Sequence, residues 1–327
     1  MRDKQIDILK AIGILLVVAG HAGSPLYHWI YSFHMPLFFF VSGFLRYSSR
    51  TKPWRVFLKD KAMTSLVPYV LFWFFSVVLY GNLYSLLRHQ QFSPFGWDQI
   101  KGLLLGGGWL SDYSNNFPLW YLQHFFLAAV VFEILVRYLP LIGKGAALVI
   151  LALLTVPIQS LLPGRPVFHI NVLPAALVFM LMGYFFHSLL CTKLQKIKDS
   201  LPMGLLLLLV GGLISSVNDG NISNIGSYLY FPGALCTISG FYILSGKVKN
   251  CRILSHIGAS TLFILGSHIL CLTYTKWFVG LLFRKIGIEL PLLENLLVTA
   301  LTVGLCCVLA ALLRYCKEKL ISIGAAK

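Results

Sequence analysis

Three ionisable residues in the first apolar run, Asp7, Lys10 and His21, are of types that can do acid–base or nucleophilic chemistry. A helix turns about 100° per residue, so the step from Lys10 to His21 leaves an offset of only about 20° and a rise of about 16 Å. Asp7 lies on a neighbouring strip of the same helix. A neutral imidazole can take up a proton or carry an acyl group at neutral pH. The pattern indicates a polar stripe with a cation near one end and a base near the other.

The same stripe also has a structural interpretation. Asp7 and Lys10 can pair at a membrane interface, and His21 can reach outward to the headgroup region. The residue types alone leave both interpretations open, because any ionisable group inside a membrane span is costly and is a functional hypothesis by default.

Three further histidines fall at a similar depth in other apolar runs: His34 in the second, His169 in the sixth and His268 in the ninth. Such imidazoles can line one cavity with His21. For His169, in the first turn of its run, we favour an interfacial side chain. None of the histidines follows a metal-ligand spacing such as His-Glu-x-x-His, so we predict no metal site.

Two features of the fourth apolar run favour structural interpretations. Glu133 precedes Arg137 by four residues, the favoured order for an ion pair along a helix. Trp120 and Tyr121 stand near the outer end, where aromatic residues commonly mark the membrane interface.

Composition decides what kind of molecule must position these residues. The 327 residues are 57% apolar and only 12% charged, and mean hydropathy is +0.79. Soluble domains carry about 25% charged residues, so the sequence excludes a soluble globular protein and predicts an all-α, polytopic membrane bundle. Apolar runs of about the length that crosses a bilayer predict ten spans, at residues 6–26, 29–46, 66–87, 117–138, 144–162, 168–188, 201–217, 225–246, 253–275 and 291–314.

The charge distribution orients this bundle. Ten spans put both termini on one side, and that side receives 21 of the 27 Lys and Arg residues, whereas the 11 acidic residues divide almost evenly. Such a bias in Lys and Arg marks the cytoplasmic side, so we predict cytoplasmic termini. The segment 47–65, between the second and third spans, is the most basic predicted loop. Topology and contact with anionic membrane lipid account for much of the basic charge, and no nucleic-acid partner is needed.

Five segments within this framework together resemble the membrane-bound acyltransferase 3 family, in particular the branch named for fucose 4-O-acetylases. The first is the run Ile6–His21, whose basic residue, ten intervening residues and histidine match the family's first helix. The others are Phe33–Phe44, which contains His34-Met35-Pro36-Leu37; Pro118–Leu122; Met182–Tyr184; and Ile257–Thr261 followed by His268.

Two positions depart from the family pattern. Many members carry Arg where this chain has Lys10, and Lys keeps the charge but loses the planar grip on phosphate. Members often have paired Arg before the third span; here Lys61 stands for the first, and Thr64 or Ser65 replaces the second.

The resemblance implies a single integral-membrane domain over residues 1–327, with no appended soluble domain, in the bacterial cytoplasmic (inner) membrane. It implies transfer of an acyl group, usually acetyl, from cytoplasmic acyl-CoA to a hydroxyl of a cell-surface or lipid-linked glycan. No permanently bound cofactor is expected, since acyl-CoA is a co-substrate. His21 is then the catalytic residue, as general base or acyl carrier. Lys10, Asp7 and Lys61 are expected to bind acyl-CoA, and His34, Ser42, Trp120 and His268 to contact or support the substrates.

The main alternative is a transporter or flippase of a glycan-lipid precursor, which ten spans and polar stripes fit equally well. The spacing of Lys10 and His21 together with the His34-Met35-Pro36-Leu37 segment favours the acyltransferase, because a transporter has no reason to share it.

Overall fold

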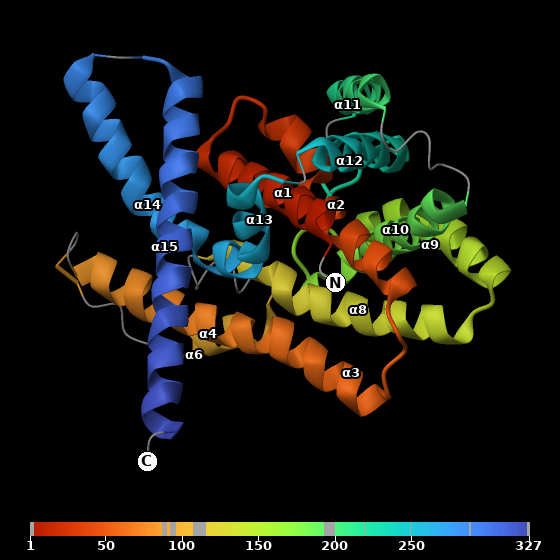
Figure 1. Cartoon of the computed structure of the whole chain (residues 1–327), viewed down its shortest axis with the longest axis horizontal. Helices are drawn as coiled ribbons and strands as arrows, with labels where there is room; N and C mark the ends of the chain where they lie inside the picture. The colour runs from red at the N-terminus through yellow and green to blue at the C-terminus, as the bar shows by residue number, and fades with distance from the viewer. Residues whose placement is uncertain are drawn as a thin grey trace. The chain divides into compact units, whose positions relative to one another are not determined.

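The computed structural model describes residues 3–86, 90–91, 96–106, 116–192, 200–218, 220–248, 250–287 and 289–325. These ranges are helical almost throughout (Figure 1). Within them, seven helical stretches are long and apolar enough to cross a membrane: Lys4–Ala22, Trp54–Leu83, Phe117–Tyr138, Leu141–Leu161, Val167–Leu189, Thr261–Ile286 and Pro291–Cys316. The predicted all-α, polytopic class is therefore confirmed.

The three remaining predicted spans correspond to helices outside that set. They are α2 (Tyr27–Ser48), α11 (Leu201–Ser216) and α12 (Tyr230–Lys247). α11 is apolar but has only 16 residues, whereas a helix needs about 20 to cross the hydrocarbon core. The predicted number of ten crossings depends on these three helices.

The chain divides into two compact units. The first unit contains residues 1–27 and 249–327, and the second contains residues 28–248.

The first unit is built around α1 (Lys4–Ala22), which contacts three later helices: α13 (Arg252–Ala259), α14 (Thr261–Ile286) and α15 (Pro291–Ala325). The Asp3 side chain accepts hydrogen bonds from the first amides of α1, as a good N-cap does. At the other end Gly23 adopts the left-handed conformation (φ 92°) that favours glycine and ends the helix. Apolar side chains of α14 and α15 form a buried cluster beside α1: Leu272, Val279, Phe283 and Val298.

The predicted ninth span, 253–275, is wrong as a single helix. The helix is interrupted at Ser260, so that α13 ends before this residue and α14 begins after it. The Ser260 amide donates to the carbonyls of His256 and Ile257, and the Thr261 hydroxyl donates to the Gly258 carbonyl over 2.7 Å. These bonds satisfy backbone groups that the break leaves open, and the crossing helix begins only at Thr261.

The second unit starts with α2 and a long helical stretch. This stretch runs from α3 (Trp54–Lys61) through a π-helical turn, Ala62–Leu66, into α4 (Val67–Phe75) and a second π-helical segment. Residues 54–65, predicted as part of a loop, are therefore helical. The stretch has 30 residues, more than the roughly 20 that a helix needs to cross the hydrocarbon core. Its first part, the basic helix α3, can therefore lie outside the hydrocarbon core.

Hydroxyl groups accompany the π-helical turn. The Thr64 hydroxyl donates to the Asp60 carbonyl over 2.8 Å, and the Ser65 hydroxyl donates to the Lys61 carbonyl over 2.6 Å. Side chains that take up backbone carbonyls in this way compete with the regular helical ladder. Single π-turns inside α-helices often lie at functional sites.

The remaining helices of the second unit are α6 (Trp97–Leu105), α8 (Trp120–Tyr138), α9 (Leu141–Leu161), α10 (Leu173–Thr192), α11 and α12. Glycines set the closest approaches between them. A Cβ on Gly43 of α2 would overlap the Met180 carbonyl of α10, and a Cβ on Gly183 of α10 would overlap the Phe40 carbonyl of α2. The segments around Gly43 and Gly183 are thus two halves of one backbone-to-backbone crossing, the use that membrane helices make of small residues.

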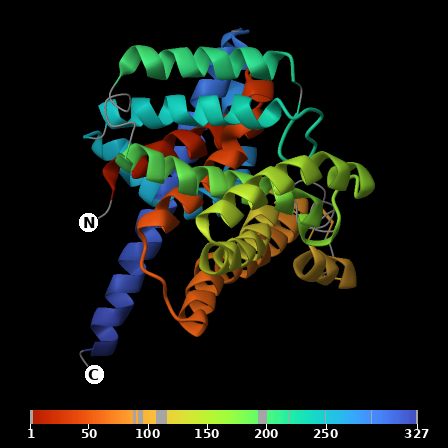
Figure 2. The same cartoon turned by 90° about the vertical axis from the view of Figure 1, so that its right-hand side faces the viewer.

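α11 and α12 lie side by side along their length (Figure 2). Each contains a pair of glycines seven residues apart that faces the other helix: Gly204 and Gly211 on α11, and Gly233 and Gly240 on α12. A Cβ at any of the four would crowd the facing helix. Two turns of one helix therefore fit closely against two turns of the other.

Candidate active site

His21 and His268 form a stacked pair in the first unit. The ring centroids are 5.3 Å apart and the planes differ by 29°. His21 lies in the last turn of α1 and His268 in the second turn of α14. The two residues are 247 positions apart in the sequence, and α14 brings them together by crossing α1. The structure thus joins two of the histidines that the sequence singles out.

Hydrogen bonds to the backbone decide the state of His268. Its Nδ1 lies 2.8 Å from the Leu265 carbonyl and 3.1 Å from the Ile264 carbonyl. A carbonyl can only accept, so Nδ1 carries the proton, and in the neutral ring Nε2 keeps a lone pair. His268 is fully buried, and its Nε2 has no hydrogen-bond partner among the described residues. A buried base of this kind is suited to proton chemistry.

The backbone around His21 is held from two other helices. The Lys276 ammonium of α14 donates to the His21 carbonyl over 3.0 Å, and the Asn295 amide of α15 donates to the Ala19 carbonyl over 3.1 Å. Sequence reasoning missed both residues as parts of a site. The available signal was Lys276 itself, a cation directly after the predicted ninth span.

Asp7 and Lys10 form an ion pair near the start of α1, with Lys10 Nζ 2.8 Å from Asp7 Oδ1. The Asp7 side chain is almost buried, while that of Lys10 is 24% exposed. Gly258 of α13 lies directly against the Asp7 carbonyl, where a Cβ would overlap the oxygen. The glycine of the Ile257–Thr261 segment therefore lets α13 approach this pair. The expected role of Lys10 and Asp7 in binding acyl-CoA stays a prediction.

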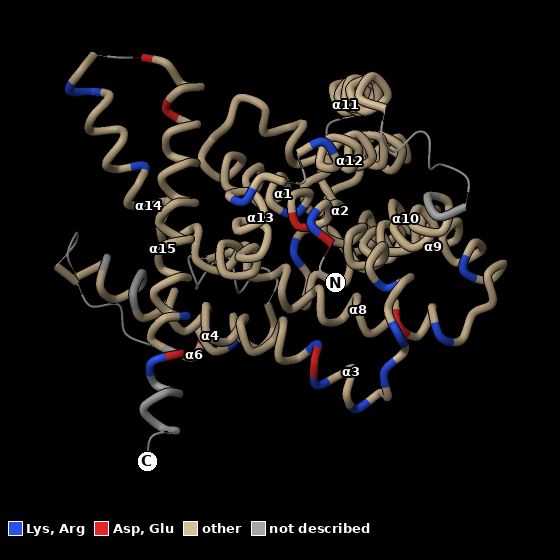
Figure 3. The backbone as a smooth tube through the Cα atoms, viewed as in Figure 1, with Lys and Arg blue, Asp and Glu red and all other residues tan. Residues whose placement is uncertain are grey.

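A basic cavity of about 470 Å³ lies in the second unit. It lies between the end of α2, the turn between α3 and α4, and the middle of α8. Lys61 and Ser42, both predicted as site residues, line it together. Figure 3 shows basic positions gathered along α3 and the segment before it. The other lining residues include the cations Arg46, Arg50 and Lys52, the acids Asp60 and Glu133, and the apolar side chains Leu45, Phe57, Met63 and Phe132.

Lys61 is oriented by aromatic rings. Its Nζ lies 5.9 Å from the centroid of Phe57 and 5.3 Å from that of Phe125, within the range of cation–π attraction. The π-helical turn begins directly after Lys61, so the irregular backbone sets where this ammonium meets the cavity.

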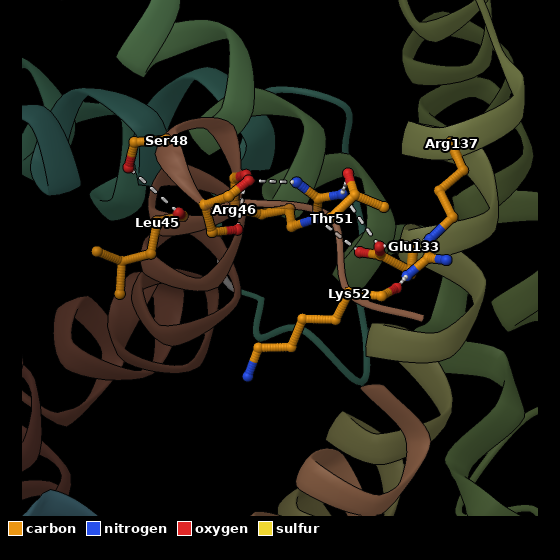
Figure 4. A network of polar contacts seen from close by, with 8 residues as sticks. Leu45, Arg46, Ser48, Thr51, Lys52, Glu133 and Arg137 are labelled. Carbon is orange, nitrogen blue, oxygen red and sulfur yellow. Dashed lines mark hydrogen bonds and ion pairs between the residues drawn. The ribbon is translucent and has the colours of Figure 1, made fainter. Parts of the chain in front are cut away.

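Glu133 anchors one wall of the cavity (Figure 4). Arg137 Nε donates to Glu133 Oε1 over 2.6 Å, which confirms the predicted pair along α8. Arg46 joins from α2 with two bonds, Nε to Oε2 at 2.7 Å and Nη2 to Oε1 at 3.0 Å. Glu133 is buried, and a buried carboxylate needs such partners. Sequence reasoning did not foresee Arg46, because 87 residues separate it from Glu133.

The two arginines also hold the segment that leads into α3. Arg46 donates to the Ser49 carbonyl and the Thr51 hydroxyl, and Arg137 donates to the Lys52 carbonyl over 2.7 Å. The Arg137 guanidinium stacks over Trp54 at 4.1 Å from the ring centroid. Glu133 therefore fixes the rim of the cavity through the arginines that neutralise it.

Trp120 lies in a separate cluster of the second unit. Its ring stacks on His169 with centroids 4.6 Å apart, and the Nδ1 of His124 donates to the Phe168 carbonyl over 3.0 Å. Phe168 and His169 both adopt positive φ angles, 55° and 50°, a strained conformation for such residues. His169, expected to be interfacial, is buried against Trp120. Tertiary packing of the turn before α10 decides this.

His34 occupies another place in the second unit. It is buried in α2, where its Nδ1 donates to the Ile30 carbonyl over 2.7 Å and its ring meets Tyr31 edge to face. His34, Ser42 and Trp120 therefore have three different surroundings: a helix interior, the basic cavity and the His169 cluster. Among the described residues, no three His, Cys, Asp or Glu side chains converge as a metal site would require.

Comparison with known proteins identifies the family. The family model Acyl_transf_3, described as an acyltransferase domain, matches residues 3–311. The chain belongs to the acyltransferase 3 family. The match covers almost the whole chain and includes helices of both units, so the resemblance carried by the five segments is confirmed.

A curated relative agrees with this assignment. The chain is 39% identical over 87 residues to the nodulation protein NolL of Sinorhizobium fredii. The aligned part covers 22% of this chain and 23% of that protein, so the chain spans less than a quarter of the relative that it matches. No solved structure matches the chain.

Proposed function

We propose that this membrane acyltransferase moves an acyl group, usually acetyl, from acyl-CoA to a hydroxyl of a cell-surface or lipid-linked glycan. The observation that carries the proposal is the His21–His268 pair: two stacked imidazoles in membrane helices, one of them a buried base with a fixed tautomer. Family membership supplies the reaction class, and the imidazoles supply a group that can move the proton which such a transfer releases.

In the proposed reaction, the glycan hydroxyl oxygen attacks the carbonyl carbon of the thioester. His21 takes the hydroxyl proton as the new C–O bond forms. The C–S bond then breaks, and the proton passes to the thiolate, so that free CoA and the acylated glycan leave. His268 supports this step by stacking on the His21 ring. An alternative route has the His21 nitrogen accept the acyl group first and pass it to the hydroxyl.

The basic cavity is the proposed site for the phosphate groups of acyl-CoA. Lys61 and Arg50 present an ammonium and a guanidinium group there, while the Lys52 ammonium is paired with Asp60 of the same cavity. Free cations of this kind form strong charge-assisted bonds to phosphate. Ser42, a hydroxyl on α2, lines the same space. The charge bias of the sequence supports placing this cavity on the cytoplasmic side of a bacterial inner membrane, where acyl-CoA is made.

The test is substitution of His21 by Ala in full-length protein, in cells that lack the native gene. Mass analysis of the cell-surface glycan should show the mass of one acyl group with the wild-type protein and none with His21→Ala at equal protein level. An active His21→Ala protein would remove His21 from the mechanism. To separate the two routes, radiolabelled acetyl-CoA is added without glycan and the reaction is quenched with denaturant: a general base leaves the protein unlabelled, and an acyl carrier becomes labelled.

A further inference from the structure

The carbonyls at the end of α1 have an unusual set of donors. The last turn of a helix leaves carbonyls without amide partners. The Gly23 amide and the Ser24 amide serve the carbonyls of Gly20 and Ala19. The next carbonyl, that of His21, receives the Lys276 ammonium over 3.0 Å. A cation at this end also complements the helix dipole.

α14 meets His21 from two directions. Side chains of a helix tilt toward its N-terminus, whereas carbonyls point toward its C-terminus. The His21 ring stacks on His268, and the His21 carbonyl receives Lys276, eight residues further along the same helix. Eight residues correspond to a rise of about 12 Å along α14. Two separate positions of α14 therefore contact His21, one at its ring and one at its backbone carbonyl.

α15 adds a third contact. The Asn295 amide donates to the Ala19 carbonyl over 3.1 Å, and Asn295 is buried. Ala19 lies one half-turn before His21, so Asn295 and Lys276 grip the same turn from two helices. Lys276 lies in the apolar helix α14; it is exposed, and the Glu294 carboxylate of α15 also attracts its ammonium.

We propose that Lys276 and Asn295 are positioning residues that hold the last turn of α1, so that the His21 ring keeps its stack on His268. Neither touches the reacting atoms in this proposal; both act through His21. The inference rests on the proposed role of His21 in acyl transfer. Misplacement of a reacting group by about 1 Å costs up to about 100-fold in rate, so loss of such a grip should appear in kcat.

The experiment measures acetyl transfer by full-length protein in membranes of its native cell, from which the gene has been deleted. Radiolabelled acetyl-CoA is the probe, and the membrane glycan is the acceptor. We expect Lys276→Met to lower kcat about 10- to 100-fold while the KM for acetyl-CoA changes less than about twofold. Lys276→Arg, which can still donate to the carbonyl, should restore most of the rate.

Arg284→Met is the matched control. Arg284 lies on the same helix two turns further on, and its Nε donates to the Gly280 carbonyl of its own helix. This variant removes the same charge from α14 without a contact to α1, and it should keep the wild-type kcat. The thermal midpoints of all variants are measured together, so that kcat is compared between equally folded proteins.

If Lys276→Met does not accumulate as folded protein, Asn295→Leu tests the second contact, with the same fall in kcat expected. Wild-type kcat in a folded Lys276→Met or Asn295→Leu variant overturns the proposal. An equal loss of kcat in Arg284→Met also overturns the proposal, because the loss would then follow from removing any positive charge from this part of α14.

His21→Ala is measured in parallel: if it is inactive while Lys276→Met is fully active, the positioning role fails and the function of His21 stands. If His21→Ala is active, the proposed function of His21 fails.

Discussion

At the scale of single residues, backbone carbonyls and buried partners decide what each polar side chain can do. Two carbonyls of α14 fix the proton of His268 on Nδ1. Two arginines make Glu133 a structural anchor, since each of its oxygens already accepts a charged donor. Residue type alone would allow either side chain to act as a base. The geometry leaves that role to the imidazoles.

Lys61 is the residue at which the cavity can be tested. Lys61→Ala should raise the KM for acetyl-CoA about 10- to 100-fold, because one charge-assisted bond to phosphate is worth roughly 1.5–3 kcal/mol and 1.4 kcal/mol corresponds to a factor of ten. The measurement is the initial rate against acetyl-CoA concentration.

Arg55→Ala serves as the control for Lys61, because Arg55 is an exposed cation of the same helix that does not line the cavity. Its KM should stay near the wild-type value. Equal increases in the two variants would indicate a general effect of basic charge and would argue against a donor site at Lys61.

At the scale of helices, close backbone crossings hold the second unit together. Gly43 and Gly183 let α2 and α10 touch at two consecutive turns. The same α2 carries Ser42 and Arg46, one residue before and three residues after the crossing. The crossing therefore sets where these two cavity residues lie.

Gly43→Ala should destabilise the protein by about 1–3 kcal/mol, the usual cost of forcing extra atoms into a close-packed site. The added methyl group meets a backbone carbonyl, which cannot rotate away. Gly145→Ala is the matched control on α9, since a Cβ there meets nothing within 4 Å; Ala in a helix should gain at most about 1 kcal/mol. Thermal midpoints in detergent compare the two. A Gly43→Ala midpoint at or above that of Gly145→Ala would contradict the crossing.

At the scale of the whole molecule, the uneven distribution of Lys and Arg carries the orientation. From the bias of 21 to six we predict that the segment 47–65, and with it the basic cavity, lies on the cytoplasmic side. The same prediction puts the loop between α14 and α15 on the outer side. Donor and acceptor should enter from opposite faces.

We expect a cysteine introduced as Ser49→Cys to be shielded from an impermeant thiol reagent in intact cells, and one introduced as Glu289→Cys to react. Both variants are made after the seven native cysteines are replaced. In inside-out vesicles, acetyl-CoA added outside should then acylate glycan enclosed in the lumen. Labelling of Ser49→Cys from outside intact cells would reverse the orientation. Absence of lumenal acylation from an active enzyme would place the whole reaction on the cytoplasmic side.

The sequence by itself determined the class of the molecule and its most local contacts. Apolar runs of bilayer length indicate crossing helices because the hydrocarbon core admits little else. The spacing of Glu133 and Arg137 predicts their pairing because one helical turn separates them. The family resemblance could be read from short segments, since Lys10, His21, Gly43 and Gly258 occupy fixed positions along single helices.

Only the tertiary structure decided which helix faces meet. The stack of His21 on His268, the grip of Lys276 and Asn295 on α1, and the bonds from Arg46 to Glu133 all join residues that are far apart in the chain. The burial of His169 against Trp120 also depends on packing, not on local pattern. Hydrophobic periodicity shows that a helix has a buried side, but in a chain with so few charges almost every side is apolar. The partners of each polar group are therefore set by how the helices cross, which short-range pattern does not encode.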